Sequence, residues 1–211
     1  MPASRITSKN PWHAVFVIDC SNSMAGQPSA ILNIAIEEFL FELLTASMGQ
    51  EPYFKVTVVS FGSHFHSLYE AVRETEINVE LVTSFVGRSG GNNSAVALEE
   101  AARILKDNPG LESDYVPTVF FLSTGRSDDP EATLNAANEL KNVTLPSGKL
   151  EIVTFGFGNA DDELLQEVAT DSEINRLLIS KRQICEFIPL IGDIGNNAAG
   201  AESIEEAIMK L

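Results

Sequence analysis

Four short hydrophobic runs punctuate the chain, and the segments between them have helical periodicity. The runs are rich in β-branched and aromatic residues and occupy residues 14–18, 54–61, 116–123 and 151–158. The first, third and fourth are almost continuously hydrophobic, which is typical of strands that are covered on both faces. The sequence therefore predicts a sheet that is buried between two layers.

Hydrophobic residues at helical spacing predict helices over residues 29–47, 94–108, 130–142 and 161–170. Pro130 suits the first position of a helix, and the acidic residues that open the fourth helix complement its dipole. Strands that alternate with helices indicate parallel pairing. We therefore expect an α/β fold of the Rossmann-like kind, a doubly wound and mostly parallel sheet with helices on both faces.

One segment departs from this alternation. In "SFGSHFHSLYE" (60–70), a Gly-Ser turn joins two short strand-like runs. A tight turn of this kind joins antiparallel neighbours, and such a strand commonly lies at the edge of an otherwise parallel sheet. We expect one antiparallel edge strand here.

The C-terminal part predicts a last strand near residues 176–179 and a helix from Lys181 that Pro189 ends or bends. No internal repeat or long linker divides the chain. We expect an N-terminal extension over residues 1–12, one domain over residues 13–192, and a loop and short helix over residues 193–211 that close the same domain.

The charge of the chain narrows the classes of partner. Its 211 residues include 30 acidic and 14 basic side chains, a net charge of −16. Such a field repels the phosphates of nucleic acids and of anionic membranes, and it attracts cations and basic partners. The simplest interpretation is an acidic surface that maintains solubility. We expect no nucleic acid and no membrane among the partners.

Other features of the sequence bear on the cellular compartment. The N-terminal segment lacks the hydrophobic region of a signal peptide, and no run approaches the roughly 20 residues of a membrane span. The two cysteines, Cys20 and Cys185, are too few for a disulfide framework and suit a reducing compartment. We expect a cytoplasmic protein, and the sequence does not indicate its oligomeric state.

The candidate chemistry lies where the first predicted strand ends. Ligands of open parallel sheets bind outside the carboxyl ends of the strands. Asp19, Ser21 and Ser23 follow the first strand at alternate positions, so an extended loop can direct all three side chains to one side. One carboxylate and two hydroxyls suit Mg²⁺, which prefers oxygen ligands, and they do not suit zinc or copper.

The motifs together resemble a known family. "VFVIDCSNSMAG", "GGNNSAVAL", "VFFLSTGRSDDP" and "VTFGFGNADDELLQEVA" are similar to the von Willebrand factor type A domain, in register from about His13 to Ile191. The most similar subgroup is the compact cytoplasmic bacterial type associated with tellurite-resistance operons. The resemblance implies a doubly wound sheet and a metal-ion-dependent adhesion site, at which a divalent cation binds a carboxylate of a partner protein.

The resemblance also implies which residues form that site. Asp19, Ser21 and Ser23 match the family pattern, whereas Asn92 stands at the position of the family threonine and Thr124 at that of the family aspartate. Both replacements keep a side-chain oxygen. Thr124 removes a negative charge, so we expect weak binding of Mg²⁺ or Mn²⁺ without a partner. Asp128 or Asp129, four or five residues further on, is an alternative source of that charge, although acidic residues in such a position more often lie at the start of a helix.

The function that the resemblance implies is a protein-interaction module and not an enzyme. The expected partner is a protein that offers an Asp or Glu side chain, and a tellurite or stress response is the implied setting. One alternative is a metal-independent scaffold that binds through another surface.

A more remote alternative is a hydrolase or phosphotransferase, with Asp19, Ser23 or Cys20 as the nucleophile. Phosphotransferases of that kind need a second acid where Ser21 stands. The three histidines, His13, His64 and His66, are expected at the far end of the first strand and on the edge hairpin. Cys20 is expected to pack as a small hydrophobic residue.

Overall fold

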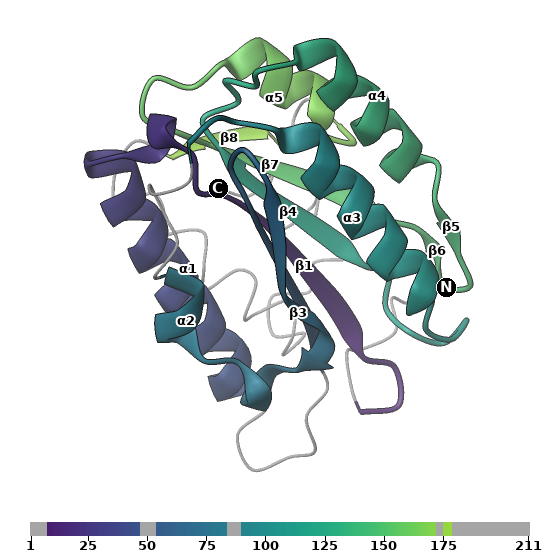
Figure 1. The fold of residues 1–211 in the computed structure, drawn as a ribbon. Coiled ribbons are helices and arrows are strands. Elements are labelled where there is room, and N and C mark those ends of the chain that lie inside the picture. The colour runs from purple at the N-terminus through teal and green to yellow at the C-terminus, as the bar shows by residue number, and fades with distance from the viewer. Residues whose placement is uncertain (1–7, 47–53, 84–89, 172–174, 179–211) are drawn as a thin grey trace.

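A six-stranded sheet runs through the computed structural model, which describes residues 8–46, 54–83, 90–171 and 175–178 (Figure 1). The strand order is β3-β2-β1-β4-β7-β8, and every pair is parallel except β2 with β3. The strands are β1 (Trp12–Asp19), β2 (Phe54–Phe61), β3 (Phe65–Arg73), β4 (Thr118–Ser123), β7 (Glu151–Phe157) and β8 (Asn175–Leu178). The predicted mostly parallel sheet with one antiparallel edge strand is confirmed.

Helices cover both faces of this sheet, as predicted (Figure 1). One face packs against α1 (Gln27–Ala46) and α2 (Val79–Thr83). The other packs against α3 (Ser94–Asp107), α4 (Pro130–Lys141) and α5 (Asp162–Val168). The short helices η1 (Asn22–Met24) and η2 (Glu74–Glu76), the hairpin of β5 (Thr144–Leu145) and β6 (Gly148–Lys149), and α2 were not predicted.

The predicted last strand is present as β8, and its N-terminal boundary lies one residue before the expected one. The helix expected from Lys181, the closing helix and the domain boundary at residue 192 lie outside the described residues. Within the described ranges, none of the helices is long and hydrophobic enough to cross a bilayer.

The central strand β1 is buried along its whole length because its alternate side chains enter two different cores. Trp12, Phe16 and Ile18 belong to the core beneath α1. Val15 and Val17 belong to the core beneath α3, α4 and α5. Burial on both faces explains why the sequence of this strand is a continuous hydrophobic run instead of an alternating one.

An aromatic cluster fixes α1 against the middle of the sheet. The rings of Phe16 and Phe120 stack with centroids 5.4 Å apart, and Phe39 of α1 meets them edge-on at 4.7 and 5.1 Å. Trp12 contacts Phe120 edge-on at 6.0 Å. These rings join β1, β4 and α1, so they hold together the two strands that precede the site described below.

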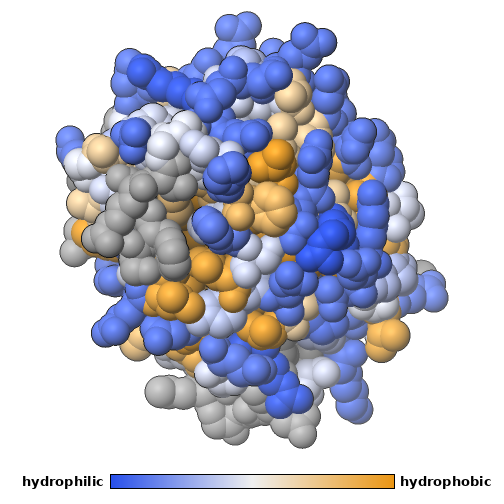
Figure 2. Space-filling view, viewed as in Figure 1, coloured by the Kyte–Doolittle hydropathy of each residue, from blue (hydrophilic) through white to orange (hydrophobic). Residues whose placement is uncertain are grey.

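The edge strand β3 is irregular. Its pairing with β2 shifts register twice, on either side of Val58, and Ala71 has a positive φ of 49°. One of its charged side chains, Glu70, pairs with Arg103 of α3 at 3.1 Å. On the face shown in Figure 2, hydrophilic side chains predominate and hydrophobic residues gather near the middle. The large hydrophobic residues that are exposed include Phe65 of β3 and Leu81 of α2.

A histidine is buried on β1, away from the loops that follow the strand. His13 Nε2 lies 2.8 Å from Thr57 Oγ1 of β2. Burial, and secondarily the charge of Lys55, lowers the pKa of His13 from 6.5 to about 3. The imidazole is therefore neutral in the folded protein at physiological pH.

We expect replacement of Phe120 by alanine to lower the free energy of unfolding by about 3–5 kcal/mol, because it removes the ring shared by three aromatic contacts. Urea unfolding measures the change. Phe41→Ala is the matched control on α1, since Phe41 is 63% exposed and its loss should change stability by less than ~0.5 kcal/mol. Equal effects of the two variants would show that the cluster does not hold α1.

We expect the free energy of unfolding to fall as the pH decreases from about 6.5 towards 3, partly because of His13. In that window the unfolded chain takes up a proton on His13 that the folded protein cannot, so protonation favours unfolding. His13→Gln should reduce the slope by up to ~1.4 kcal/mol per pH unit in urea unfolding. Parallel pH profiles of the wild type and the variant would contradict the assignment.

Candidate functional site

The site lies at the carboxyl edge of the sheet, where β1 ends at Asp19. The register places Asp19 beside Phe61, the last residue of β2, and Ile18 beside Leu122 of β4. The loops that leave β1 and β4 therefore meet at one edge. Asp19 is fully buried there.

Hydrogen-bond donors from three loops surround the Asp19 carboxylate. Its Oδ1 accepts the Ser21 N–H at 2.8 Å. Its Oδ2 accepts the Asn92 Nδ2–H and the Ser123 hydroxyl, both at 2.7 Å, and the Thr124 N–H at 3.3 Å. In the described part of the chain, no basic side chain lies within ion-pair distance of Asp19. Hydrogen bonds alone thus solvate this buried charge.

Three hydroxyls form a hydrogen-bonded chain beside the carboxylate. Ser21 Oγ lies 2.7 Å from Ser23 Oγ, which lies 2.9 Å from Thr124 Oγ1. Thr124 Oγ1 is also 3.5 Å from Asp19 Oδ2. Ser21 and Thr124, at the two ends of this chain, are buried, whereas Ser23 in the middle is exposed, so the site reaches solvent at Ser23.

Asn92 is nearly completely buried, with 3% of its surface exposed. Its amide nitrogen donates to Asp19, and its Oδ1 has no hydrogen-bond partner among the described residues. A buried carbonyl oxygen without a partner is energetically costly and indicates a missing donor or cation. All five residues expected at the site, Asp19, Ser21, Ser23, Asn92 and Thr124, are thus brought together.

Two glycines allow the loop that carries Asn92 to approach the loop that follows β1. Gly90 has a φ of +66°, and its carbonyl accepts the Asn22 N–H at 2.9 Å. A side chain at Gly91 would collide with Asp128. Asp128 Oδ2 in turn accepts the Asn92 N–H at 2.8 Å, which holds the loop at its place.

Of the two roles considered for Asp128 and Asp129 from the sequence, the structure gives Asp129 the one at the start of a helix. Asp128 binds the backbone of Asn92, and Asp129 caps α4 by accepting the Ala132 N–H at 3.0 Å. Neither carboxylate is hydrogen-bonded to Ser21, Ser23 or Thr124 in these described loops. Asp128 therefore positions Asn92.

Ser123 is a member of the site that sequence reasoning missed. Its hydroxyl donates to Asp19 and accepts the Gly125 N–H at 3.0 Å. Its position as the last residue of β4, directly before Thr124, was a signal that could have identified it. In the next loop, Asp161 N–H donates to the Thr124 carbonyl at 2.8 Å, which attaches the β7–α5 loop to the site.

In the described part of the chain, neither Cys20 nor a histidine is placed as an activated nucleophile or as its base. Cys20 belongs to the core beneath α1, and burial, reinforced by the charge of Asp19, raises the pKa of its thiol to about 12. The thiol is therefore protonated and inert, as its expected packing role requires. His13 is bonded to Thr57, and His64 and His66 are exposed on the edge hairpin.

The donor set fits a hard divalent cation. It consists of three hydroxyl oxygens and one carboxylate, and the buried Asn92 side chain, whose Oδ1 has no hydrogen-bond partner among the described residues, contacts that carboxylate through its amide nitrogen. No group of three or more His, Cys, Asp or Glu side chains that could hold a metal occurs among the residues described. A softer or more highly charged site is thus not formed there, and oxygen donors are those that Mg²⁺ and Mn²⁺ accept.

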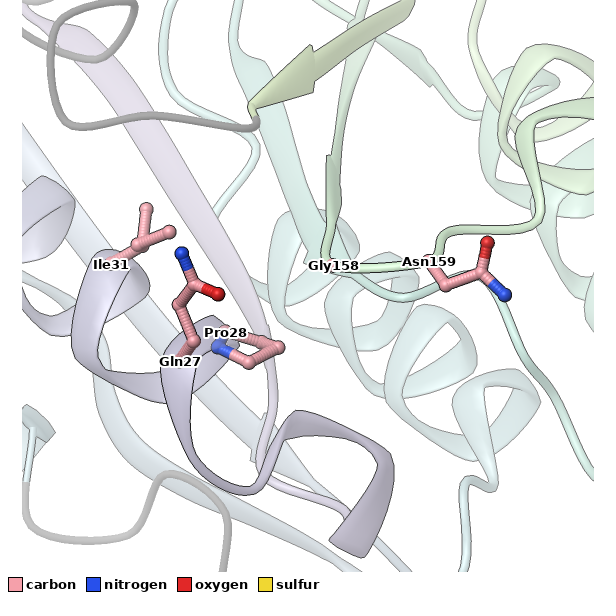
Figure 3. Close-up of a pocket in the computed structure, with 5 residues that line it drawn as sticks. All are labelled: Gln27, Pro28, Ile31, Gly158 and Asn159. Atoms are coloured by element: carbon pink, nitrogen blue, oxygen red, sulfur yellow. The ribbon is translucent and has the colours of Figure 1, made fainter.

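A cavity of about 420 Å³ opens at the start of α1 (Figure 3). It is lined by Gln27, Pro28, Ile31, Gly158 and Asn159. The Pro28 ring points towards Gly158, where a side chain would come within 2.9 Å of it. The Asn159 carbonyl accepts the Arg126 Nε–H at 2.8 Å, which connects this cavity to the loop after Thr124.

A family profile covers most of the chain. The profile of the von Willebrand factor type A domain matches residues 14–183. A von Willebrand factor A domain-containing protein of Dictyostelium discoideum is 26% identical over 159 residues. That match covers 74% of this chain and 15% of the relative, so the chain spans less than a fifth of the length of this protein.

Solved structures with similar folds come from diverse proteins. The pilus adhesin SpaC of Lactobacillus rhamnosus GG has a TM-score of 0.68 at 15% identity, over 92% of this chain and 32% of the adhesin. The manganese-loaded TRAP protein of Plasmodium vivax has a TM-score of 0.63 at 16% identity, over 86% of this chain and 73% of TRAP. At these identities the similarity shows the fold.

We expect Asp19→Ala to lower the free energy of unfolding by about 2–4 kcal/mol, because it leaves several buried donors without an acceptor. The measurement is urea unfolding in the presence of EDTA. Asp129→Ala is the matched control, since it removes a helix cap and should cost only ~1 kcal/mol. A smaller effect at Asp19 than at Asp129 would show that the carboxylate does not organise the loops.

Proposed function

The chain belongs to the von Willebrand factor type A domain family, and from this premise we propose that it binds a carboxylate of a partner protein through a divalent cation. Domains of this family are protein-interaction modules. The residues that we assign to the cation are Asp19, Ser21, Ser23, Asn92 and Thr124.

The observation that carries this proposal is the convergence of three hydroxyls above one buried carboxylate, with contacts of 2.7 and 2.9 Å between them. Ser21 and Ser23 would bind Mg²⁺ or Mn²⁺ directly and Asp19 through a water molecule. Asn92 and Thr124 complete the oxygen donors. When bound, the cation supplies a positive charge that attracts an Asp or Glu side chain of the partner.

Two proteins with similar structures also support the proposal. One is described as manganese-loaded, and another is a pilus adhesin. The cavity beside the start of α1 adds a partly hydrophobic depression on the partner-facing edge. A location in the cytoplasm and a part in a tellurite or stress response belong to the same proposal. They rest on the low cysteine content and on sequence resemblance alone.

The test is capture of a partner by the immobilised protein from a lysate of its source cells, with Mg²⁺ or with EDTA. We expect a partner that is retained with Mg²⁺, released by EDTA and lost with Ser21→Ala, because Ser21 Oγ is a proposed ligand. Ser29→Ala is the matched control. The Ser29 hydroxyl lies at the start of α1 and bonds the Gly26 carbonyl, so capture should be unchanged.

Two other outcomes would replace the proposal. A partner that stays bound in EDTA and to Ser21→Ala would identify a metal-independent scaffold. Turnover of generic ester or phosphate substrates that Asp19→Asn abolishes would identify a hydrolase or phosphotransferase.

A further inference from the structure

We propose that the cation and the partner's carboxylate bind this site cooperatively, because Thr124 leaves the site with Asp19 as its single carboxylate. This inference rests on the proposed function and concerns how that function is regulated. It predicts positive coupling between the two ligands, in which each raises the affinity of the protein for the other.

The charge of the site is the first step of the argument. Of the five proposed ligands only Asp19 is negative, and a divalent cation beside it leaves a net charge of +1 in a site where every ligand except Ser23 is buried. An uncompensated charge of this kind is costly where water is excluded. A second carboxylate from the partner makes the site neutral, so it removes a cost that the cation alone cannot avoid.

Nearby acidic side chains do not supply the missing charge. Asp128 accepts the Asn92 N–H and Asp129 accepts the Ala132 N–H, so both are engaged in holding loops. Both residues are also exposed, and solvent and salt screen their charges more strongly than that of the buried Asp19. The compensating charge must therefore come from outside the described loops.

The hydroxyls add a second cost to binding the cation alone. Ser21, Ser23 and Thr124 already satisfy one another at 2.7 and 2.9 Å, and a cation must replace these hydrogen bonds. Mg²⁺ in addition gives up its own water reluctantly. Cation binding must therefore compensate for these lost hydrogen bonds, and a further ligand from a partner contributes to that compensation.

Thr124 is the residue through which the coupling can be changed. It is buried, and its Oγ1 is 2.9 Å from Ser23 Oγ and 3.5 Å from Asp19 Oδ2. A carboxylate at this position would stand beside that of Asp19, so the metal-free protein would be destabilised by like charges. The same two charges would bind a divalent cation without a partner.

The test is titration with MnCl₂, followed by the electron paramagnetic resonance signal of free Mn²⁺. The carboxylate probe is the peptide acetyl-Gly-Asp-Gly-amide, and acetyl-Gly-Asn-Gly-amide is its uncharged control. For the wild type we expect the Asp peptide to tighten Mn²⁺ binding about tenfold relative to the Asn peptide. Thr124→Asp should bind Mn²⁺ tightly with either peptide, and Thr124→Asn should behave as the wild type.

Three results would overturn the inference. Equally tight binding of Mn²⁺ by the wild type with both peptides would show that the cation binds alone, and the proposed function would stand. Equal gains from Thr124→Asp and Thr124→Asn would show that charge is not the cause. If neither the wild type nor Thr124→Asp binds Mn²⁺ with either peptide, both the inference and the proposed cation site are refuted.

The wild-type comparison of the two peptides needs no variant, so it decides the inference even where Thr124→Asp does not fold without metal. Asn92→Asp is a second variant that adds the same charge. In the native structure Asn92 Nδ2 lies 2.7 Å from Asp19 Oδ2. Thermal unfolding of each variant with EDTA and with MnCl₂ provides an independent measurement, in which Mn²⁺ restores the stability that the added charge removes.

Discussion

The buried carboxylate of Asp19 is the group on which this edge of the molecule depends. A charge that is removed from water must be solvated by the protein, and here the donors come from the loop after β1, the loop before α3, and the end of β4 with the loop that follows it. Each loop can satisfy its own donor only by coming close to the end of β1. The electrostatic requirement of one side chain therefore determines how three loops, distant in sequence, are arranged.

The sheet makes this arrangement possible. Because β1 lies between β2 and β4 in parallel register, the ends of all three strands meet at the same edge, and the Asn93 N–H donates to the Gly62 carbonyl at 2.8 Å, which attaches the loop of Asn92 to the end of β2. The aromatic rings shared by β1, β4 and α1 keep the strand ends fixed relative to one another. A site built on such rigid supports needs little reorganisation when a ligand arrives, which lowers the entropy cost of binding.

The sequence predicted the parts of this structure that repeat a physical pattern. Continuous hydrophobic runs identified the central strands, and the polar residues that end the run at Asp19 identified the edge of the sheet. Asn92 and Thr124 were located by resemblance to a family. The hydrogen bonds of Ser123 and Asp128 were not predicted from the sequence. A hydroxyl or carboxylate on a loop has many possible partners, and only the folded geometry selects one. The five-residue α2 was missed because it is too short to show periodicity.

The irregular edge strand β3 has a consequence for the behaviour of the molecule at high concentration. Two register shifts and the left-handed Ala71 twist its backbone away from the straight array of donors and acceptors that another strand would need. Growth of the sheet from one molecule into the next is thereby obstructed. Many copies can crowd together, as on a surface or in a tandem array, without polymerising through this edge.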